Sequence, residues 1–353
     1  MAATSSLALK VAVIGGGVIG LACARALALR GAEVALYERD TPGRAASWVA
    51  GGMLAATLES GESVDGLQAM LHESLARWDD YAAALEAESG VSISLRREGL
   101  LRVGDDLAAL REEQEKLSGR GRLEWLDGEA LRRLEPHLRG AGALFAPDDH
   151  HVDNRRLVIA LAQACVAAGV AIHEYASVDE VLIRGGRAVG VSVDGQVMPA
   201  DAVVVAAGAW AAALGLAPFA HIVPVKGQIL ALQMDPLAPV LRHVVWGSGV
   251  YLIPRNDGRL IVGASVEPEA GFDAGLDPAV MKGLRAGAAR IIPLTEHLPV
   301  VGEWSGFRPG PAHHLPVIGK TDIPGLFGAA GLYRNGILLT PLTGELVARA
   351  VFA

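Results

Sequence analysis

Cysteine and runs of like charge are the scarcest features of this sequence of 353 residues. Cys23 and Cys165 are its only cysteines, which excludes a framework of several disulfides and suits a reducing compartment, so we expect a cytoplasmic protein. The formal net charge is −8 and no long basic run is present, so we expect no nucleic-acid partner. Only nine residues precede Lys10, and we therefore expect no signal peptide.

Long uncharged segments are scarce too, with one exception at AVVVAAGAWAAALGLAPFA, residues 202–220. Its 19 residues would be long enough for a membrane span. Gly208 and Pro218 interrupt it, however, and alanine dominates its composition. We predict a buried strand over Ala202–Ala206, followed by a turn and a short helix, and no membrane span.

The beginning of the chain has the pattern of a β-α-β unit. Lys10–Ile14 is a short β-branched run, a helical pattern extends from Val18 to Arg30, and Glu33–Tyr37 (EVALY) has the pattern of a second strand. Such a unit is typical of nucleotide-binding domains. At roughly 100–200 residues per domain, the length of the chain predicts a second domain.

The turn of this unit carries a glycine motif. Gly15, Gly17 and Gly20 form G-x-G-x-x-G between the first strand and the helix. Free N–H groups at a helix N-terminus hold a pyrophosphate, and side chains at these positions would block its approach. Glu38 follows Gly20 by eighteen residues (38 − 20) at the end of the second strand. Its carboxylate can accept hydrogen bonds from ribose hydroxyls and disfavours a 2′-phosphate. The motif alone leaves NAD and FAD open.

Further elements follow from periodicity. Three segments have helical spacing and three have strand character, in order Leu67–Glu88, Gly99–Gly104, Leu107–Leu117, Leu157–Ala168, Val178–Ile183 and Ala188–Val193. Between Val223 and Val266, four strand-like runs are separated by proline, glycine and the hairpin signal Asn256–Gly258. This block predicts an antiparallel substrate domain that interrupts a discontinuous nucleotide domain.

Eight motifs then point to one family. They are ASWVAGGMLA (46–55), VVVAAGAW (203–210), PVKGQ (224–228), YLIPR (251–255), GRLIVGAS (258–265), GFRPG (306–310), LPVIG (315–319) and YRNGILLTP (333–341). In this order, over nearly the whole chain, they resemble the D-amino-acid oxidase family of flavoproteins. The similarity is greatest to its glycine oxidase branch, which is associated with thiamine synthesis.

The resemblance implies an α/β fold. A discontinuous Rossmann-like FAD domain of the glutathione-reductase type would comprise residues 1–75, 145–220 and 305–353. An α+β substrate domain with a mainly antiparallel sheet would comprise residues 76–144 and 221–304. A homo-oligomer, a dimer or a tetramer, is also expected.

The resemblance also implies how FAD is bound. Covalent relatives use a cysteine near the end of the substrate domain, which this chain lacks, so FAD should be non-covalent. Thr340 and Pro341 fit the N-cap and N1 positions of a last helix. The residues expected to bind FAD are Gly15, Gly17, Val18, Ile19, Gly20, Glu38, Arg39, Ala46, Ser47, Gly51, Gly52, Met53, Val178, Gly208, Leu332, Tyr333, Arg334, Asn335, Gly336, Ile337 and Leu338.

Three further assignments concern the substrate. Arg308 in GFRPG would anchor the α-carboxylate, because the planar guanidinium matches a carboxylate bidentately. Tyr251 would reach the same carboxylate, unless it is an ordinary residue of an amphipathic strand. Arg334 would lie beside substrate and flavin, unless it pairs with an acid across the domain boundary. Hydride would then pass from the α-carbon of a neutral amine to FAD, and dioxygen would take the electrons and form peroxide.

Some alternatives stay open at this point. Leu332, Gly249 and Pro311–His313 depart from the family pattern, which leaves the preferred amine open among glycine, sarcosine and small D-amino acids. A quinone-linked D-amino-acid dehydrogenase, a flavin subunit of a heteromeric amine oxidase and the oxidase half of a tRNA-modifying enzyme are the other hypotheses. The pairs His150–His151 and His313–His314 are interpreted as loop residues and not as metal ligands. Cys23 and Cys165 are interpreted as packed thiols on helices.

Overall fold

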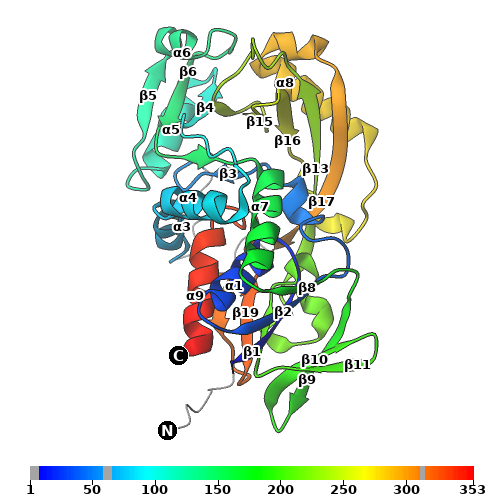
Figure 1. Cartoon of the computed structure of the whole chain (residues 1–353). Coiled ribbons are helices and arrows are strands. Elements are labelled where there is room, and N and C mark those ends of the chain that lie inside the picture. Colours follow the sequence, from blue (N-terminus) through cyan, green and yellow to red (C-terminus); the bar gives the residue numbers. More distant parts are fainter. Residues whose placement is uncertain (1–7, 59–65, 311–314) are drawn as a thin grey trace.

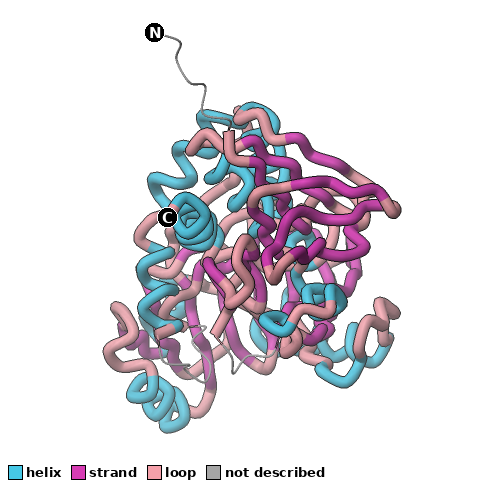
Figure 2. The backbone as a smooth tube through the Cα atoms, turned by 90° about the horizontal axis from the view of Figure 1, so that it is seen from below, coloured by secondary structure: helices cyan, strands magenta, loops and turns pink. Residues whose placement is uncertain are grey.

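A computed structural model describes residues 8–58, 66–310 and 315–353 of the protein. Figure 1 shows two lobes, with a largely parallel sheet in the lobe that holds both chain ends and a larger sheet in the other. The turned view in Figure 2 shows helices gathered toward the side of the C-terminus and strands toward the opposite side. The chain passes from one lobe to the other several times, because the strands of each sheet come from separate parts of the sequence.

The first sheet has the order β18-β19-β12-β1-β2-β8. All neighbours are parallel except β18 and β19. Its strands come from both ends and from the middle of the chain, so the sheet is discontinuous in sequence. They are β1 (Lys10–Ile14), β2 (Glu33–Tyr37), β8 (Ala171–His173), β12 (Ala202–Val205), β18 (Val317–Lys320) and β19 (Leu326–Ala330).

Both faces of this sheet are covered. Helices α1 (Val18–Ala28), α7 (Asn154–Ala167) and α9 (Thr340–Phe352) share one hydrophobic core with it. A three-stranded sheet packs on the opposite face, formed by β9 (Val178–Arg184), β10 (Arg187–Val193) and β11 (Gln196–Pro199). Burial on both faces explains why the central strands are continuous apolar runs without alternation.

The second sheet has the order β17-β13-β16-β15-β14-β4-β6-β5. It is antiparallel throughout except for the β14–β4 pair. Its strands are β4 (Leu100–Gly104), β5 (Glu124–Asp127), β6 (Gly142–Ala146), β13 (Val223–Gln233), β14 (Val244–Gly247), β15 (Val250–Pro254), β16 (Arg259–Gly263) and β17 (Val300–Gly310). Helix α8 (Pro278–Ile291) packs on one face, and the expected hairpin at Asn256–Gly258 joins β15 to β16. The antiparallel block is thus confirmed.

Short elements complete the chain. They are α2 (Ala46–Val49), β3 (Met53–Leu54), α5 (Leu107–Lys116), α6 (Gly128–Leu134), β7 (His150–His151), and the 3₁₀ turns Gly208–Leu214, Ala217–Phe219, Pro268–Ala270 and Pro293–His297. The segment 202–220 therefore begins with the strand β12 and continues through a turn into short 3₁₀ helices, in agreement with the prediction. The domain boundaries stay a prediction, and β6 and β17 run across the expected limits at residues 145 and 305.

Three local predictions were wrong. The segment Leu67–Glu88 forms two helices, α3 (Leu67–Leu75) and α4 (Trp78–Ser89), because the chain turns at Ala76 and Arg77. Leu339, not Thr340, is the N-cap of α9, since helical hydrogen bonds already begin at Asn335.

The third correction concerns the first histidine pair. His150 and His151 form β7, which pairs with β3, and His151 is buried, so they are not loop residues. His313 and His314 lie outside the described residues.

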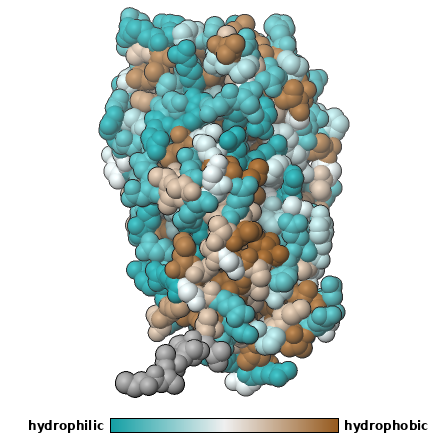
Figure 3. Space-filling model, viewed as in Figure 1, coloured by the Kyte–Doolittle hydropathy of each residue, from teal (hydrophilic) through white to brown (hydrophobic). Residues whose placement is uncertain are grey.

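The surface shows no broad apolar band on the face of Figure 3, where hydrophilic residues predominate and hydrophobic ones gather in small groups. Within the described ranges, none of the helices combines the length and the apolar composition that crossing a membrane requires.

Both cysteines are buried thiols, as predicted. Cys23 lies on α1 and Cys165 on α7, and neither forms a disulfide. Burial raises the pKa of the Cys165 thiol to about 12 and raises that of Cys23 as well.

Because the thiolate is the reactive species, we expect both cysteines to resist a thiol reagent in the native protein. A disulfide reagent such as Ellman's, at about pH 8, should report almost no thiol before denaturation and both thiols afterwards. Rapid reaction of the native protein would contradict the burial of these side chains.

Candidate active site

The N-terminus of α1 is built for close approach of a ligand. Gly17 is its N-cap, without a side-chain cap, and no acidic residue lies in the first turn. A Cβ atom at Gly20 would lie 1.8 Å from the carbonyl oxygen of Gly15, so the turn and helix pack through glycine alone. The N–H of Val18 donates to Oγ of Ser47 at 3.1 Å. The dipole of α1 and the other N–H groups of its first turn favour an anion at this end.

Glu38 stands at the end of β2 beside this turn. Its carboxylate accepts hydrogen bonds from the N–H of Gly16 at 2.6 Å and of Asp40 at 3.1 Å. Next to it, the Arg39 guanidinium lies 3.5 Å from the centre of the Trp210 ring. These side chains line a nucleotide pocket, defined here by Gly15, Gly17, Tyr37, Glu38, Arg39, Ala46, Ser47, Val178, Gly208 and Trp210 among its lining residues.

A second pocket, the arginine pocket, adjoins the first. Arg308, Arg334, Tyr251, Phe307 and Ile229 are among its lining residues. The two pockets share five residues, namely Gly17, Ala46, Ser47, Ala206 and Gly208. They therefore form one groove that leads from Glu38, past the N-terminus of α1, to Arg308.

Arg308 reaches this groove from β17. Its Nη1 donates to the carbonyl oxygens of Ser265 at 3.1 Å and Lys226 at 3.3 Å. A Cβ at Gly227 would lie 2.3 Å from that Nη1, so the guanidinium lies across β13 where glycine leaves space. This explains the glycine of the PVKGQ motif.

Tyr251, like Arg308, lies over a glycine of the neighbouring strand. It lies on β15 directly opposite Gly263 of β16. A Cβ at Gly263 would lie 2.4 Å from the phenol oxygen. Trp246 packs against the ring edge-on, with centroids 6.5 Å apart. Only 7% of Tyr251 is exposed, and the residue lines the arginine pocket. Its role toward a substrate stays a prediction.

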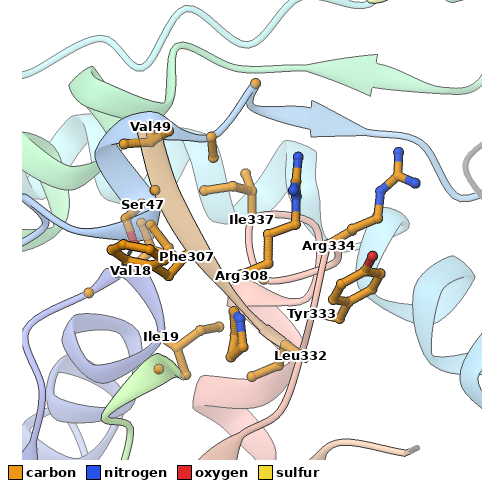
Figure 4. Close-up of a pocket in the computed structure, with 18 of the residues that line it drawn as sticks. Val18, Ile19, Ser47, Val49, Phe307, Arg308, Leu332, Tyr333, Arg334 and Ile337 are labelled. Carbon is orange, nitrogen blue, oxygen red and sulfur yellow. Dashed lines mark hydrogen bonds between the residues drawn. The ribbon is translucent and has the colours of Figure 1, made fainter. Parts of the chain in front are cut away.

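Arg334 enters from the loop before α9. The N–H of Tyr333 donates to the carbonyl of Pro309 at 2.9 Å, which ties this loop to β17 beside Arg308. In Figure 4 the two arginine side chains point the same way, Arg308 from the strand and Arg334 from the loop. Two segments far apart in sequence thus bring their positive charges into one pocket.

Most residues predicted to bind the cofactor line the groove, and three do not. Gly20 packs against Gly15, Asn335 closes the turn to Leu332 through its N–H, and Leu338 offers its carbonyl to Ser74 and Trp78. The arginine pocket contains the remaining predicted residues, which are Val18, Ile19, Gly51, Gly52, Met53, Leu332, Tyr333, Gly336 and Ile337. Their roles toward a cofactor stay predictions.

Sequence reasoning missed several lining residues. Trp210, Phe307 and Val49 line the groove, and Asn154 holds α2 through bonds from its amide to the carbonyls of Ser47 and Trp48. Trp210 and Phe307 stood within quoted motifs, but a motif does not show which way a side chain points.

The groove fits an extended dinucleotide. Its middle lies at the glycine-packed end of α1, where a pyrophosphate is favoured, and Glu38 offers acceptors at one end. At the other end, a second sheet contributes arginine and tyrosine above apolar walls. Fold and site thus define a dinucleotide-dependent oxidoreductase with a separate substrate sheet.

Comparison with known proteins narrows this class. The sequence profile of the DAO family, described as FAD dependent oxidoreductase, matches residues 10–350. Glycine oxidase of Geobacillus kaustophilus (strain HTA426) is 38% identical, with 97% of this chain and 92% of that protein covered. A solved glycine oxidase structure from Geobacillus kaustophilus has a TM-score of 0.89 at 34% identity, with 98% and 95% covered.

A longer relative is the bifunctional protein ThiO/ThiG of Nostoc sp. (strain PCC 7120). It is 34% identical over 96% of this chain, which spans only 52% of the length of that protein. From these matches, the chain belongs to the DAO family of FAD-dependent oxidoreductases. FAD is accordingly its cofactor.

Gly20→Ala tests the glycine packing at α1. The added methyl cannot coexist with the Gly15 carbonyl, so the turn must move and FAD affinity should fall by at least tenfold, measured by fluorescence titration of the FAD-free protein. Gly283→Ala on α8 is the matched control, because nothing lies within 4 Å of a Cβ there. Equal FAD affinity in the two variants would contradict the assignment of this turn.

Proposed function

We propose that this chain oxidises glycine or another small amino acid, with sarcosine and D-alanine as the nearest alternatives, and that dioxygen takes the electrons. One observation carries the proposal. Among the described residues, the arginine pocket is lined by two arginines and two tyrosines but by no Asp, Glu, His or Lys. Such a pocket favours a small carboxylate and offers no side-chain base.

The roles of the residues follow from this lining. The Arg308 fork binds the α-carboxylate, and the hydroxyl of Tyr251 donates to the same group. Arg334 adds a second positive charge beside the reacting carbon. Without a lining base, the amine must enter as the neutral form, so that its lone pair assists loss of hydride. FAD, held in the groove, would supply the hydride acceptor and the route of the electrons to dioxygen, with peroxide as the reduced product.

The walls support a small substrate. Ile229, Phe307, Leu332 and Ile337 are apolar and line the same pocket. They exclude water from the reacting carbon, which strengthens the charge interactions of the arginines. The relatives named glycine oxidase support glycine, and the two-part ThiO/ThiG relatives support a role in thiamine synthesis. Non-covalent FAD, a cytoplasmic location and a dimer or tetramer are further proposals.

The substrate class can be tested directly. Purified protein saturated with FAD should release peroxide with glycine, sarcosine or D-alanine, and little with ethylamine, which lacks the carboxylate that Arg308 binds. Dye reduction without peroxide would indicate the quinone-linked dehydrogenase, and a strong preference for bulky D-amino acids would contradict a small pocket.

Arg308→Ala tests the carboxylate anchor. Truncating one partner of a buried charged pair typically costs about 2–5 kcal/mol, so kcat/KM for glycine should fall roughly 30- to several-thousand-fold. Arg308→Lys should recover only part, because an ammonium lacks the planar fork. The control is Arg290→Ala, an arginine at the end of α8 that is not among the lining residues of the pocket. Near-wild-type kcat/KM in Arg308→Ala would refute the anchor.

A further inference from the structure

Arg255 is a buried arginine to which the proposed function assigns no role. Only 7% of the residue is exposed. Among the described residues it has no carboxylate in ion-pair contact. Burial lowers the pKa of its guanidinium to about 10. A buried charge without an ion pair is costly, so its hydrogen bonds must compensate for lost water.

Those hydrogen bonds join segments far apart in sequence. Nη1 donates to the carbonyl of Val152 at 2.6 Å, and Nη2 donates to the carbonyl of Gly51 at 2.7 Å and to Oδ1 of Asn154 at 2.9 Å. The planar fork therefore spans the loop that contains Gly51 and the start of α7. Lysine cannot reproduce this geometry with one nitrogen atom.

Side chains of β15, the strand that precedes Arg255, pack closely against Gly51. Tyr251, Ile253 and Arg255 alternate along β15 and its continuation, so their side chains share one face. A Cβ at Gly51 would lie 2.7 Å from Cδ1 of Ile253 and 3.5 Å from the Tyr251 ring. The Arg255 N–H donates to the carbonyl of Arg259 at 2.8 Å, which continues the strand pairing.

The loop at Gly51 is part of the groove. Gly51, Gly52 and Met53 line the arginine pocket, together with Tyr251. The carbonyl of Gly52 accepts a hydrogen bond from the N–H of Val152 at 2.8 Å. Arg255 thus connects the loop on the cofactor side with the strand that carries the substrate tyrosine.

We propose that Arg255 is a positioning residue. Through the carbonyl of Gly51, it holds the cofactor-side loop at a fixed distance from β15 and hence from Tyr251. The effect of Arg255 on the position of Tyr251 toward substrate rests on the proposed function. Its effect on the loop at Gly51 requires only that the protein binds FAD.

Arg255→Met, Arg255→Lys and the control Arg259→Met test the proposal. Arg259 is half-buried in the same region, but its side-chain hydrogen bonds among the described residues go to Asp153 and Asp257 and not to the loop at Gly51. Arg255→Met leaves three carbonyl-type acceptors without a charged donor, so FAD should bind at least tenfold more weakly. The visible circular dichroism of bound FAD should also change, whereas Arg259→Met should retain both properties.

Chemical rescue separates positioning from general destabilisation. Arg255 also lines a cavity outside the groove, together with Ser94, Arg96, Asp153, Arg156 and Asn256 among other residues. In Arg255→Ala, guanidinium ion at non-denaturing concentration should restore FAD affinity and the flavin spectrum. Arg259→Ala should not respond. At saturating FAD, Arg255→Met should also lower kcat/KM for glycine more than Arg259→Met does.

The outcomes are distinguishable. Wild-type FAD affinity and spectrum in Arg255→Met, with only a lower Tm, would overturn the proposal, as would equal changes in Arg259→Met. If Arg255→Met does not fold, Arg255→Lys is the deciding variant. Wild-type FAD affinity and spectrum in Arg255→Lys would overturn the proposal, because they would show that the planar guanidinium is not required. FAD affinity and spectrum are measured without amino acid, so absence of glycine turnover would refute the proposed function and leave this test intact.

Discussion

The pairing of β13 with β17 is the constraint on which the rest of the structure depends. At one end of this pair, Ala231 faces Gly302 inside the second sheet, and at the other end Val225 faces Arg308 beside the groove. The carbonyl of Pro309 then binds the loop that carries Arg334. One ladder of backbone hydrogen bonds therefore joins the second sheet to the lobe that contains the first sheet and determines the positions of both arginines.

Space for these charged side chains comes from glycine on the neighbouring strand. Arg308 lies over Gly227 and Tyr251 over Gly263, and any side chain at either glycine would occupy the place of the functional group. The same fold thus accommodates large polar side chains inside a closely packed sheet. Glycine here serves close approach and not backbone flexibility.

Charge is distributed unevenly over the molecule. The chain as a whole is acidic, with a formal net charge of −8, while among the described residues the charged side chains that line the arginine pocket are both arginines, Arg308 and Arg334. The arginine pocket therefore favours an anionic ligand locally, although the chain as a whole has a negative net charge. Arg255 differs from the two pocket arginines, because it does not line the arginine pocket and its two terminal nitrogens donate to the loop at Gly51 and to the start of α7.

The sequence predicted the two kinds of sheet and the antiparallel block, because periodicity and turn residues act over a few positions. It failed where distant contacts decide the outcome. From the sequence, His151 is predicted to be a loop residue. In the structure it lies in β7, which pairs with β3, and its side chain is buried. Helix α9 begins one residue earlier than predicted, at Thr340, so its N-cap is Leu339 in place of Thr340.

By itself, the sequence determined the nucleotide-binding unit, since Gly15, Gly17, Gly20 and Glu38 act through local geometry at one strand, turn and helix. Only the tertiary structure decided where the side chain of each arginine lies. Arg308 and Arg334 both line the arginine pocket, whereas Arg255 donates to the loop at Gly51. The direction of each guanidinium depends on strand register and on glycine across the ladder, and neither can be read from residue spacing.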